Sequence, residues 1–190
     1  LYILPYITRS KHTHFTVGPI NLGLAKQNPR GLLDPAVPVG TKLDPGAKVL
    51  HDLSWKRILD SYACVQCNRC QDVCPANFYG RPLSPSALEV NKRYLIKEAT
   101  FGSYPDRLLL PLTETVISAE AVWSCTTCHA CVSVCPVGNE PMADIIDIRR
   151  RLLIDGAEID SGVQNALQSL ATNGNWMSKG KRLRGRWAKE

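Results

Sequence analysis

The sequence predicts a mostly α-helical protein built from two related halves. Two cysteine runs of identical spacing lie in the middle of the chain, and helical patterns of apolar residues precede and follow each run. Serine, aspartate and proline stand where these helices should begin, and glycine stands where they should end. We find no alternating pattern that predicts a strand, so the expected fold class is mostly α.

The helix ahead of the first cysteine run should begin after Ser54, a residue type that commonly caps helix N-termini. Its apolar residues recur at helical spacing and should form one face, made of Trp55, Ile58, Leu59, Tyr62 and Ala63. The helix after the first run should extend from Pro85 to about Ala99. Proline suits a first helical position, and Ser86 and Glu89 have the spacing of a capping box.

Two further helices are expected around the second cysteine run. A short helix should begin at Ser118 and lead into the run. A longer helix should follow the run, with Gly156 at its C-terminal cap. Its apolar stripe consists of Met142, Ile145, Ile146, Leu152 and Leu153.

The last helix should begin at Asp160 or Ser161 and end at Asn173, just before Gly174. Trp176 follows this end closely, and we expect it to fold back on the helix face that carries Leu167 and Leu170.

Composition divides the chain into three parts. Residues 1–50 should form an extended arm, because they hold six of the 13 prolines and five of the 13 glycines without a regular pattern longer than one turn. Residues 51–176 should form the folded domain, and residues 177–190 a basic tail or linker. We expect neither a secretory signal nor a membrane-spanning helix, since no apolar run approaches the ~18 residues that a span needs.

Most of the net charge of +6 belongs to the tail. Between Lys179 and Glu190, six basic residues accompany one acidic residue, so this block carries +5 and the rest of the chain +1. A nucleic-acid-binding face needs basic groups spread over a folded surface, and we therefore expect no nucleic-acid partner.

The two cysteine runs share the pattern C-x2-C-x2-C-x3-C-P and contain all eight cysteines of the chain. Their members are Cys64, Cys67, Cys70 and Cys74 in the first run, and Cys125, Cys128, Cys131 and Cys135 in the second. Each residue of the second run lies 61 positions after its counterpart (125 − 64, 128 − 67, 131 − 70, 135 − 74). This pattern is typical of proteins with two [4Fe–4S] clusters.

The spacing also predicts which cysteines share a cluster. Three cysteines separated by two residues each bind one cubane, and the fourth cysteine of the run ligates the other cubane. Cluster 1 should therefore be held by Cys64, Cys67, Cys70 and Cys135, and cluster 2 by Cys125, Cys128, Cys131 and Cys74.

Other uses of these cysteines fit the sequence less well. Disulfides need an oxidising compartment, and structural zinc uses separated C-x2-C pairs that leave no role for the third cysteine of each triplet. Four cysteine ligands per cubane leave no iron open to substrate, and we find no phosphate-binding loop or catalytic triad. His129 and Arg69 occupy equivalent positions between ligands, where a positive charge would raise the potential of the neighbouring cluster; a solvated loop side chain is the simpler interpretation.

Several stretches resemble the heterodisulfide-reductase-related membrane iron–sulfur oxidoreductases, most closely the type that passes electrons from electron-transfer flavoprotein to menaquinone. The similar stretches are residues 52–60, 62–64, 67–76, 80–85, 123–128, 135–140 and 145–150. The chain departs from the family where Asn68 and His129 replace a glycine in the triplets, and where no proline follows Asn175. These departures bear on cluster potential and tail conformation, not on cluster binding.

The resemblance implies a longer parent protein. In that family a haem-bearing membrane region comes first, then this double-cluster segment, then cysteine-rich domains with a further iron–sulfur site. The N-terminal residues 5–15 resemble the end of the membrane region, and residues 173–176 and 186–188 the approach to the cysteine-rich region. In that setting His12 or His14 would lie near a haem; taken alone, each is a loop histidine.

We therefore expect an α-helical ferredoxin, with two pseudo-repeated helical halves around two cubane clusters. The chain should relay single electrons without a substrate-converting site of its own. The parent should be a membrane-bound oxidoreductase, with this cytoplasmic segment at the cytoplasmic face of the membrane, relaying electrons between a flavin donor and the quinone pool. Its partners should be a flavoprotein donor, the adjoining cysteine-rich domains and the haem-bearing region.

Two alternatives stay open at this point. One is an iron–sulfur subunit of a soluble or peripheral dehydrogenase, of the glycolate, glycerol-3-phosphate or heterodisulfide type. The other is a structural zinc or nucleic-acid-binding module, which the basic tail allows.

Overall fold

The computed structural model describes residues 11–25, 46–102, 104–157 and 160–180, together with 183 and 186. Its helical elements, with η for 3-10 helices, are η1 (Lys11–Thr13), α2 (His14–Gly23), η2 (Leu50–Asp52), α3 (Trp55–Ala63), α4 (Arg69–Asp72), α5 (Pro75–Phe78), α6 (Pro85–Phe101), η3 (Pro105–Leu109), α7 (Leu112–Thr115), α8 (Ala119–Ser124), α9 (Ala130–Ser133), α10 (Pro141–Ile154) and α11 (Ser161–Asn173). No strand occurs in these ranges, and the predicted mostly α fold is confirmed.

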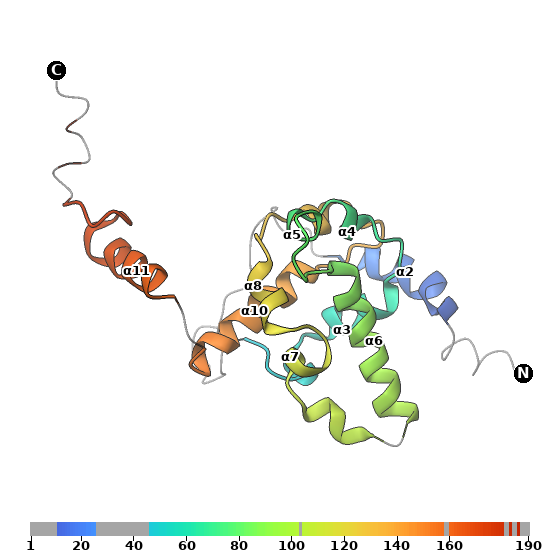
Figure 1. The fold of residues 1–190 in the computed structure, drawn as a ribbon. Helices are drawn as coiled ribbons and strands as arrows, with labels where there is room; N and C mark the ends of the chain where they lie inside the picture. The colour runs from blue at the N-terminus through green and yellow to red at the C-terminus, as the bar shows by residue number, and fades with distance from the viewer. Residues whose placement is uncertain are drawn as a thin grey trace, which may run out of the picture. The chain divides into compact units, whose positions relative to one another are not determined.

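The chain divides into two compact units, Leu1–Leu152 and Leu153–Glu190. The first unit contains all eight cysteines and the helices α2 to α9 with most of α10, as Figure 1 shows. The second unit contains α11. The division therefore falls ahead of α11, whereas the sequence led us to expect one domain over residues 51–176. Residues 1–10 and 26–45 of the predicted arm, and most of the tail after residue 180, lie outside the described residues.

An apolar core joins the helices that flank the cysteine runs. Leu88 and Leu95 of α6 and Ile145 and Ile148 of α10 are at most 3% exposed. Other members of this core come from the connecting segments and from α7 and α8: Leu50, Leu53, Leu83, Leu112, Val116 and Val122. The core thus fixes the segments that lead into and out of each cysteine run.

Helix caps agree with the sequence at three of four predicted positions. Ser54 stands at the N-cap position of α3, and the Ser118 side chain accepts a hydrogen bond from Ala121 N at the start of α8. Asp160 caps α11 in the same way. The predicted capping box of α6 is wrong: the cap is Ser84, whose hydroxyl accepts from Ala87 N.

Ser86 and Glu89 do not cap α6 because both are buried on it, at 6% and 2% exposure. The Ser86 hydroxyl donates instead to Gln71 Oε1 of α4, at 3.1 Å. These side chains therefore point towards the cysteine loops rather than back to the helix start.

The buried side of α3 carries charges. Lys56, Arg57 and Asp60 are at most 7% exposed, whereas Trp55, expected on the buried apolar face, is 65% exposed. The reason is a set of ion pairs that α3 makes with α6 and α10, described below.

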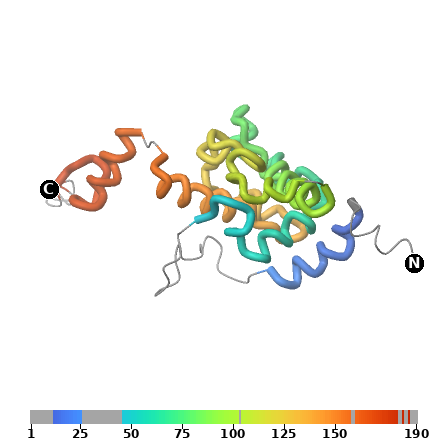
Figure 2. The backbone as a smooth tube through the Cα atoms, turned by 90° about the horizontal axis from the view of Figure 1, so that it is seen from below, coloured from blue at the N-terminus to red at the C-terminus, as the bar shows by residue number. Residues whose placement is uncertain are grey.

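The predicted extended arm is wrong for the described residues 11–23, because residues 14–23 form α2, which packs along α3 (Figure 2). Asn21 of α2 is fully buried, and a Cβ on Gly18 would lie only 3.2 Å from Val137 Cγ1. The close approach at Gly18 and the buried contacts of Asn21 hold the helix in place, although Pro19 lies inside it. No helix in the described ranges is both long enough and apolar enough to span a bilayer.

The end of the predicted arm is also part of the fold. Ala47 and Leu50 are buried, and Ala47 N donates to Asp147 O of α10 at 3.0 Å. Gly46, with a φ of +92°, turns the chain against α10, where a Cβ would lie 2.5 Å from Arg151 N. Only glycine fits this contact.

In the second unit, α11 ends at Gly174 in the left-handed conformation, as predicted. The predicted fold-back of Trp176 is wrong, since Trp176 is 64% exposed. The chain returns to the helix through polar contacts instead: Ser169 Oγ donates to Asn175 O and accepts from Ser178 N.

Candidate metal centres

Five cysteines from both runs line one cavity of about 400 Å³. They are Cys64, Cys67, Cys70, Cys131 and Cys135. A water molecule occupies ~30 Å³ in the liquid, so the cavity has room for a group of several atoms. Among the described residues, no three histidine, cysteine or acidic side chains converge on one point as the ligands of a single metal ion would.

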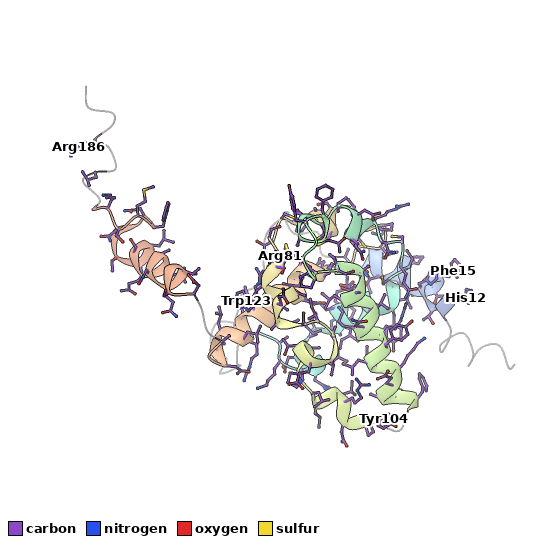
Figure 3. The ribbon with its side chains drawn as sticks, viewed as in Figure 1. His12, Phe15, Arg81, Tyr104, Trp123 and Arg186 are labelled. Atoms are coloured by element: carbon purple, nitrogen blue, oxygen red, sulfur yellow. The ribbon has the colours of Figure 1, made fainter. Side chains whose placement is uncertain are left out.

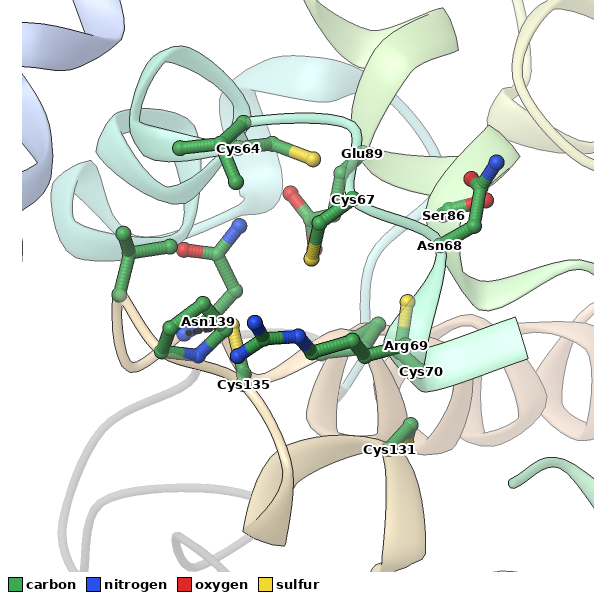
Figure 4. Close-up of a pocket in the computed structure, with 14 residues that line it drawn as sticks. Cys64, Cys67, Asn68, Arg69, Cys70, Ser86, Glu89, Cys131, Cys135 and Asn139 are labelled. Carbon is green, nitrogen blue, oxygen red and sulfur yellow. Dashed lines mark hydrogen bonds between the residues drawn. The ribbon is translucent and has the colours of Figure 1, made fainter. Parts of the chain in front are cut away.

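The cavity brings together segments that are distant in sequence. Figure 4 shows Cys64 at the end of α3, Cys67 in the loop that follows and Cys70 on α4, with Cys135 entering from the second run on the opposite side. The cavity therefore combines the first three cysteines of one run with the fourth of the other.

The cysteine thiols of this group influence one another. Burial raises the pKa of Cys70 to about 12, and the nearby charges of Cys64, Cys131, Cys135 and Cys67 raise it further. Burial likewise raises the pKa of Cys64 to about 11. Without metal these thiols are protonated at neutral pH, so binding iron must release their protons.

The remaining cysteines form a second group. Burial raises the pKa of Cys131 to about 12, and the charges of Cys125, Cys128 and Cys74 raise it further. The pKa of Cys125 is also raised, first by burial, with Cys74 and Cys128 adding to the effect. Cys74 of the first run thus lies among the triplet of the second run.

The backbone repeats between the two runs as closely as the cysteines do. Gln66 and Asn68 have φ values of +57° and +60°, and Thr127 and His129, 61 residues later, have +53° and +66°. Asn68 and His129 stand directly before the one-turn helices α4 and α9, which contact each other. Left-handed backbone favours glycine, which explains the family's usual residue at Asn68 and His129; asparagine and histidine are among the side chains that tolerate it best.

Backbone amides point at two of the sulfur atoms. Thr127 N donates to Cys125 Sγ at 3.4 Å, and Asn139 N donates to Cys135 Sγ at 3.3 Å. Hydrogen bonds to ligand sulfur are one of the means by which a protein sets the potential of an iron–sulfur cluster.

A pair of arginines holds the first cysteine of each run. Arg93 of α6 donates to Cys64 O at 3.2 Å, and Arg149 of α10 donates to Cys125 O at 2.5 Å. These arginines are 56 positions apart (149 − 93), and so are the prolines that begin the two helices, Pro85 and Pro141 (141 − 85). The pseudo-repeat therefore extends from the cysteine loops into α6 and α10. Figure 3 shows Trp123, over which the Arg149 guanidinium lies at 5.4 Å.

Buried charges adjoin the first cavity. Lys92 of α6 is fully buried and forms ion pairs with Asp144 of α10 and with Glu89, whose Oε2 lies 2.9 Å away. Arg57 of α3 pairs with Asp144 at 3.4 Å and with Asp147 at 2.6 Å. Glu89 also lines the cavity, so this network connects the three helices with the site of the first cysteine group.

Sequence reasoning did not find these charges. Lysine, arginine and aspartate at helical spacing are typical of a solvated face, and only the close spacing of Lys56 with Asp60 and of Glu89 with Lys92 hinted at pairing.

The other candidate side chains lie as follows. The His129 ring nitrogen Nδ1 lies 3.3 Å from Ser133 Oγ, one turn along α9, and Arg69 is exposed at the mouth of the cavity (Figure 4). His12 and His14 lie in the helical segment η1–α2 rather than in a loop, and both rings contact that of Phe15 (Figure 3).

Comparison with known families matches the 4Fe-4S dicluster domain over residues 63–139. This range contains all eight cysteines and both left-handed loops. Together with the donor set of eight thiols, it establishes two [4Fe–4S] clusters as the cofactors. No solved structure is significantly similar to the chain.

Three curated relatives are informative. The chain is 31% identical to "Probable iron-sulfur-binding oxidoreductase FadF" of Bacillus subtilis, over the whole of this chain and 32% of the relative. It is 27% identical to "EtfAB:quinone oxidoreductase" of Syntrophomonas wolfei, over 76% of this chain and 24% of the relative. It is 32% identical to one polypeptide of the ferredoxin:CoB-CoM heterodisulfide reductase of Methanosarcina mazei, over 50% of this chain and 48% of the relative. The chain thus spans between a quarter and a half of the length of these relatives.

Proposed function

Since this chain is an electron-transfer segment related to the heterodisulfide-reductase type of iron–sulfur oxidoreductase, we propose that its two [4Fe–4S] clusters are bound in a crossed arrangement. Cluster 1 binds to Cys64, Cys67, Cys70 and Cys135, and cluster 2 to Cys125, Cys128, Cys131 and Cys74. The observation that carries the proposal is the shared cavity, in which Cys135 faces the triplet of the other run (Figure 4).

Each part of the chain has a definite task in this arrangement. Each cluster, when bound, exchanges one electron. The left-handed loops curve the triplets around the cavity, and Arg93 and Arg149 fix the carbonyl groups at which those loops begin. The crossed fourth ligands join the two halves, so the clusters lie close to each other along a single path.

Exchange of the fourth ligands tests the crossed arrangement. In the Cys135→Ser variant, the altered electron paramagnetic resonance (EPR) signal and midpoint potential should belong to the same cluster as in Cys64→Ser. In the Cys74→Ser variant they should match those of Cys125→Ser. If Cys74→Ser instead alters the cluster that Cys64→Ser alters, each run binds its own cluster and the proposal fails.

We further propose that this segment works within a longer membrane-bound oxidoreductase, at its cytoplasmic face. Redox partner proteins supply and accept its electrons; we infer a flavoprotein as the donor and the quinone pool as the final acceptor. Support comes from the relative named as an EtfAB:quinone oxidoreductase and from the resemblance of the cysteine segments to that class. The N-terminal part and the basic tail would then be the junctions with a haem-bearing membrane region and with cysteine-rich domains.

The full-length protein in membranes provides the test. Reduced electron-transfer flavoprotein should reduce both clusters within the turnover time, and a menaquinone analogue should reoxidise them. The similarity to part of a heterodisulfide reductase favours a second candidate, an iron–sulfur subunit of a peripheral dehydrogenase complex. That candidate is supported instead if the clusters take electrons only from a soluble dehydrogenase and ignore the flavoprotein.

A further inference from the structure

Three buried polar side chains meet where α2, α3 and the segment after Cys135 come together. Asn21, Asp60 and Asn139 are 0%, 1% and 2% exposed. We call these three residues the polar junction. Its position is unusual for an electron-transfer site, because Asn21 belongs to α2, 43 residues ahead of the first cysteine (64 − 21).

Asn21 connects all three segments through one amide group. Its Nδ2 donates to Asp60 Oδ1 at 2.7 Å, to Val137 O at 2.9 Å and to Asn139 Oδ1 at 3.1 Å. Its own Oδ1 has no hydrogen-bond partner in the described structure, so the amide acts there as a donor. Asn139 completes the junction by donating from Nδ2 to Asp60 O at 2.8 Å.

The junction leads directly to a cluster ligand. The backbone N–H of Asn139 donates to Cys135 Sγ at 3.3 Å. The segment that carries Asn139 is held on both sides: Gly18 of α2 packs closely on Val137, and Lys56 of α3 donates to Gly138 O at 3.3 Å. The orientation of the Asn139 amide towards sulfur therefore depends on contacts made by α2 and α3.

We infer that Asn21 is a positioning residue for cluster 1, through which the docking of α2 and the potential of that cluster are coupled. This inference rests on the proposed function, in which Cys135 is the fourth ligand of cluster 1. An N–H···S hydrogen bond stabilises the more negative, reduced cluster, so a well-oriented Asn139 amide raises the midpoint potential. Loss of the Asn21 donor frees the segment and lowers that potential.

The coupling must act in both directions. If α2 docking favours the reduced cluster, then cluster 1 in place favours the docked α2 by the same free energy. The segment ahead of the cysteines would thus respond to the state of cluster 1, and a partner that moves α2 would adjust the potential of cluster 1 without touching the cluster.

Two substitutions separate this role from general stability. Asn21→Ala removes the donor, and Asn21→Asp keeps the shape but places a carboxylate against Asp60. The matched control is Thr16→Ala, because Thr16 is exposed on the same helix and bonds only to Thr13 O. EPR-monitored redox titration of the loaded full chain measures both midpoints.

We expect both Asn21 variants to lower the reduced fraction of cluster 1, at the wild-type midpoint, by three- to tenfold. This corresponds to roughly 30–60 mV for a one-electron couple. Cluster 2 and the Thr16→Ala variant should keep wild-type midpoints. Unchanged midpoints in both Asn21 variants, or equal shifts of both clusters, would overturn the inference.

A second measurement keeps Asn21 in place and does not depend on the Asn21 variants folding. Hydrogen exchange of residues 14–23 should become at least tenfold faster in Cys135→Ser than in the wild type, and less so in Cys74→Ser. Equal exchange in these two variants contradicts the coupling. Iron analysis of the wild type comes first: without two clusters the proposed function itself fails, whereas two clusters with no effect of Asn21 refute only this inference.

Discussion

Among single residues, Asp144 joins three helices. It lies on α10, forms an ion pair with Lys92 of α6 and accepts from Arg57 of α3 at 3.4 Å, all at low exposure. Breaking a buried pair by removing one partner leaves the other charge uncompensated. We expect Asp144→Asn to lower the free energy of unfolding of the loaded protein by about 3–5 kcal/mol, as measured by chemical denaturation at pH 7.

The control is an ion pair on the surface of the same helix α6. Glu98 pairs with Arg107, and both side chains are nearly half exposed. Glu98→Gln should cost at most about 1 kcal/mol, because water screens an exposed pair. If the two substitutions cost the same, the buried network does not stabilise the fold as described.

Glu89 gives the fold a dependence on pH. Burial raises its pKa to about 8, and the charges of Asp144 and Asp60 raise it further, although Lys92 opposes the shift. The folded state therefore binds a proton at Glu89 that the unfolded state releases near pH 4.5. Stability at this group is present at low pH and is lost as the pH rises from about 4.5 through 8.

We expect the loaded wild-type protein to lose stability between pH 6 and pH 9, by on the order of 1–3 kcal/mol from this group. In Glu89→Gln, which is neutral at every pH, the loss should be smaller by that amount. The measurement is chemical denaturation at both pH values, with the Glu98→Gln variant as the control for a general charge effect. An unchanged pH slope in Glu89→Gln would contradict the assignment.

The residues of the site were predictable from the sequence to very different degrees. Cysteine spacing identified every candidate ligand, because the geometry of a cubane imposes it. The buried charges were not predictable, since helical periodicity assigns Lys56, Arg57 and Asp60 to a solvated face. Their burial depends on partners such as Asp144 that are distant in sequence.

At the level of elements, α6 and α10 play matching roles behind the two cysteine runs. Each begins with a proline and carries, eight residues later, the arginine that binds the carbonyl of the first cysteine. A positive charge near a cluster stabilises its reduced form. At an effective dielectric of about 20, the loss of such a charge is worth about 1–2 kcal/mol.

We therefore expect Arg149→Gln to lower the midpoint of cluster 2 by roughly 40–90 mV and to leave cluster 1 nearly unchanged. Arg93→Gln should do the reverse. Arg149→Lys keeps the charge and serves as the control, with a shift of less than half that size. Redox titration that finds both clusters shifted by either glutamine variant would show that the two helices do not serve separate clusters.

Helix prediction succeeded where a local signal exists. The starts of α3, α8 and α11 follow from Ser54, Ser118 and Asp160, because a cap is encoded within a few residues. It failed for α2, where Pro19 and neighbouring glycines suggest an arm. That helix is stabilised by contacts with α3 and with Val137, which no local pattern reveals.

For the whole molecule, the clusters should be part of the fold. The site is made of short helices and loops, and in the proposed arrangement the cluster ligands join the two halves of the first unit. Anaerobic chelation of iron should abolish the near-UV circular dichroism signal and make residues 46–152 protease-sensitive. An apo chain that melts as cooperatively as the loaded chain would show that the apolar core suffices.

The overall class was predictable because two exact copies of one motif admit few structures. The division into units was not, since the boundary at Leu152 depends on contacts that the helical pattern of α10 does not encode. The sequence also placed the helix 161–173 inside the cluster domain, whereas it belongs to the second unit.

The most direct test of the account is the metal content of the anaerobically purified chain. Two [4Fe–4S] clusters on eight cysteines require about eight iron and eight sulfide per chain, with reduction giving the EPR signals of two interacting clusters. About four of each, with one signal, would contradict the two-cluster arrangement. Zinc in place of iron, without sulfide, would contradict electron transfer itself and identify the chain as a structural metal-binding module.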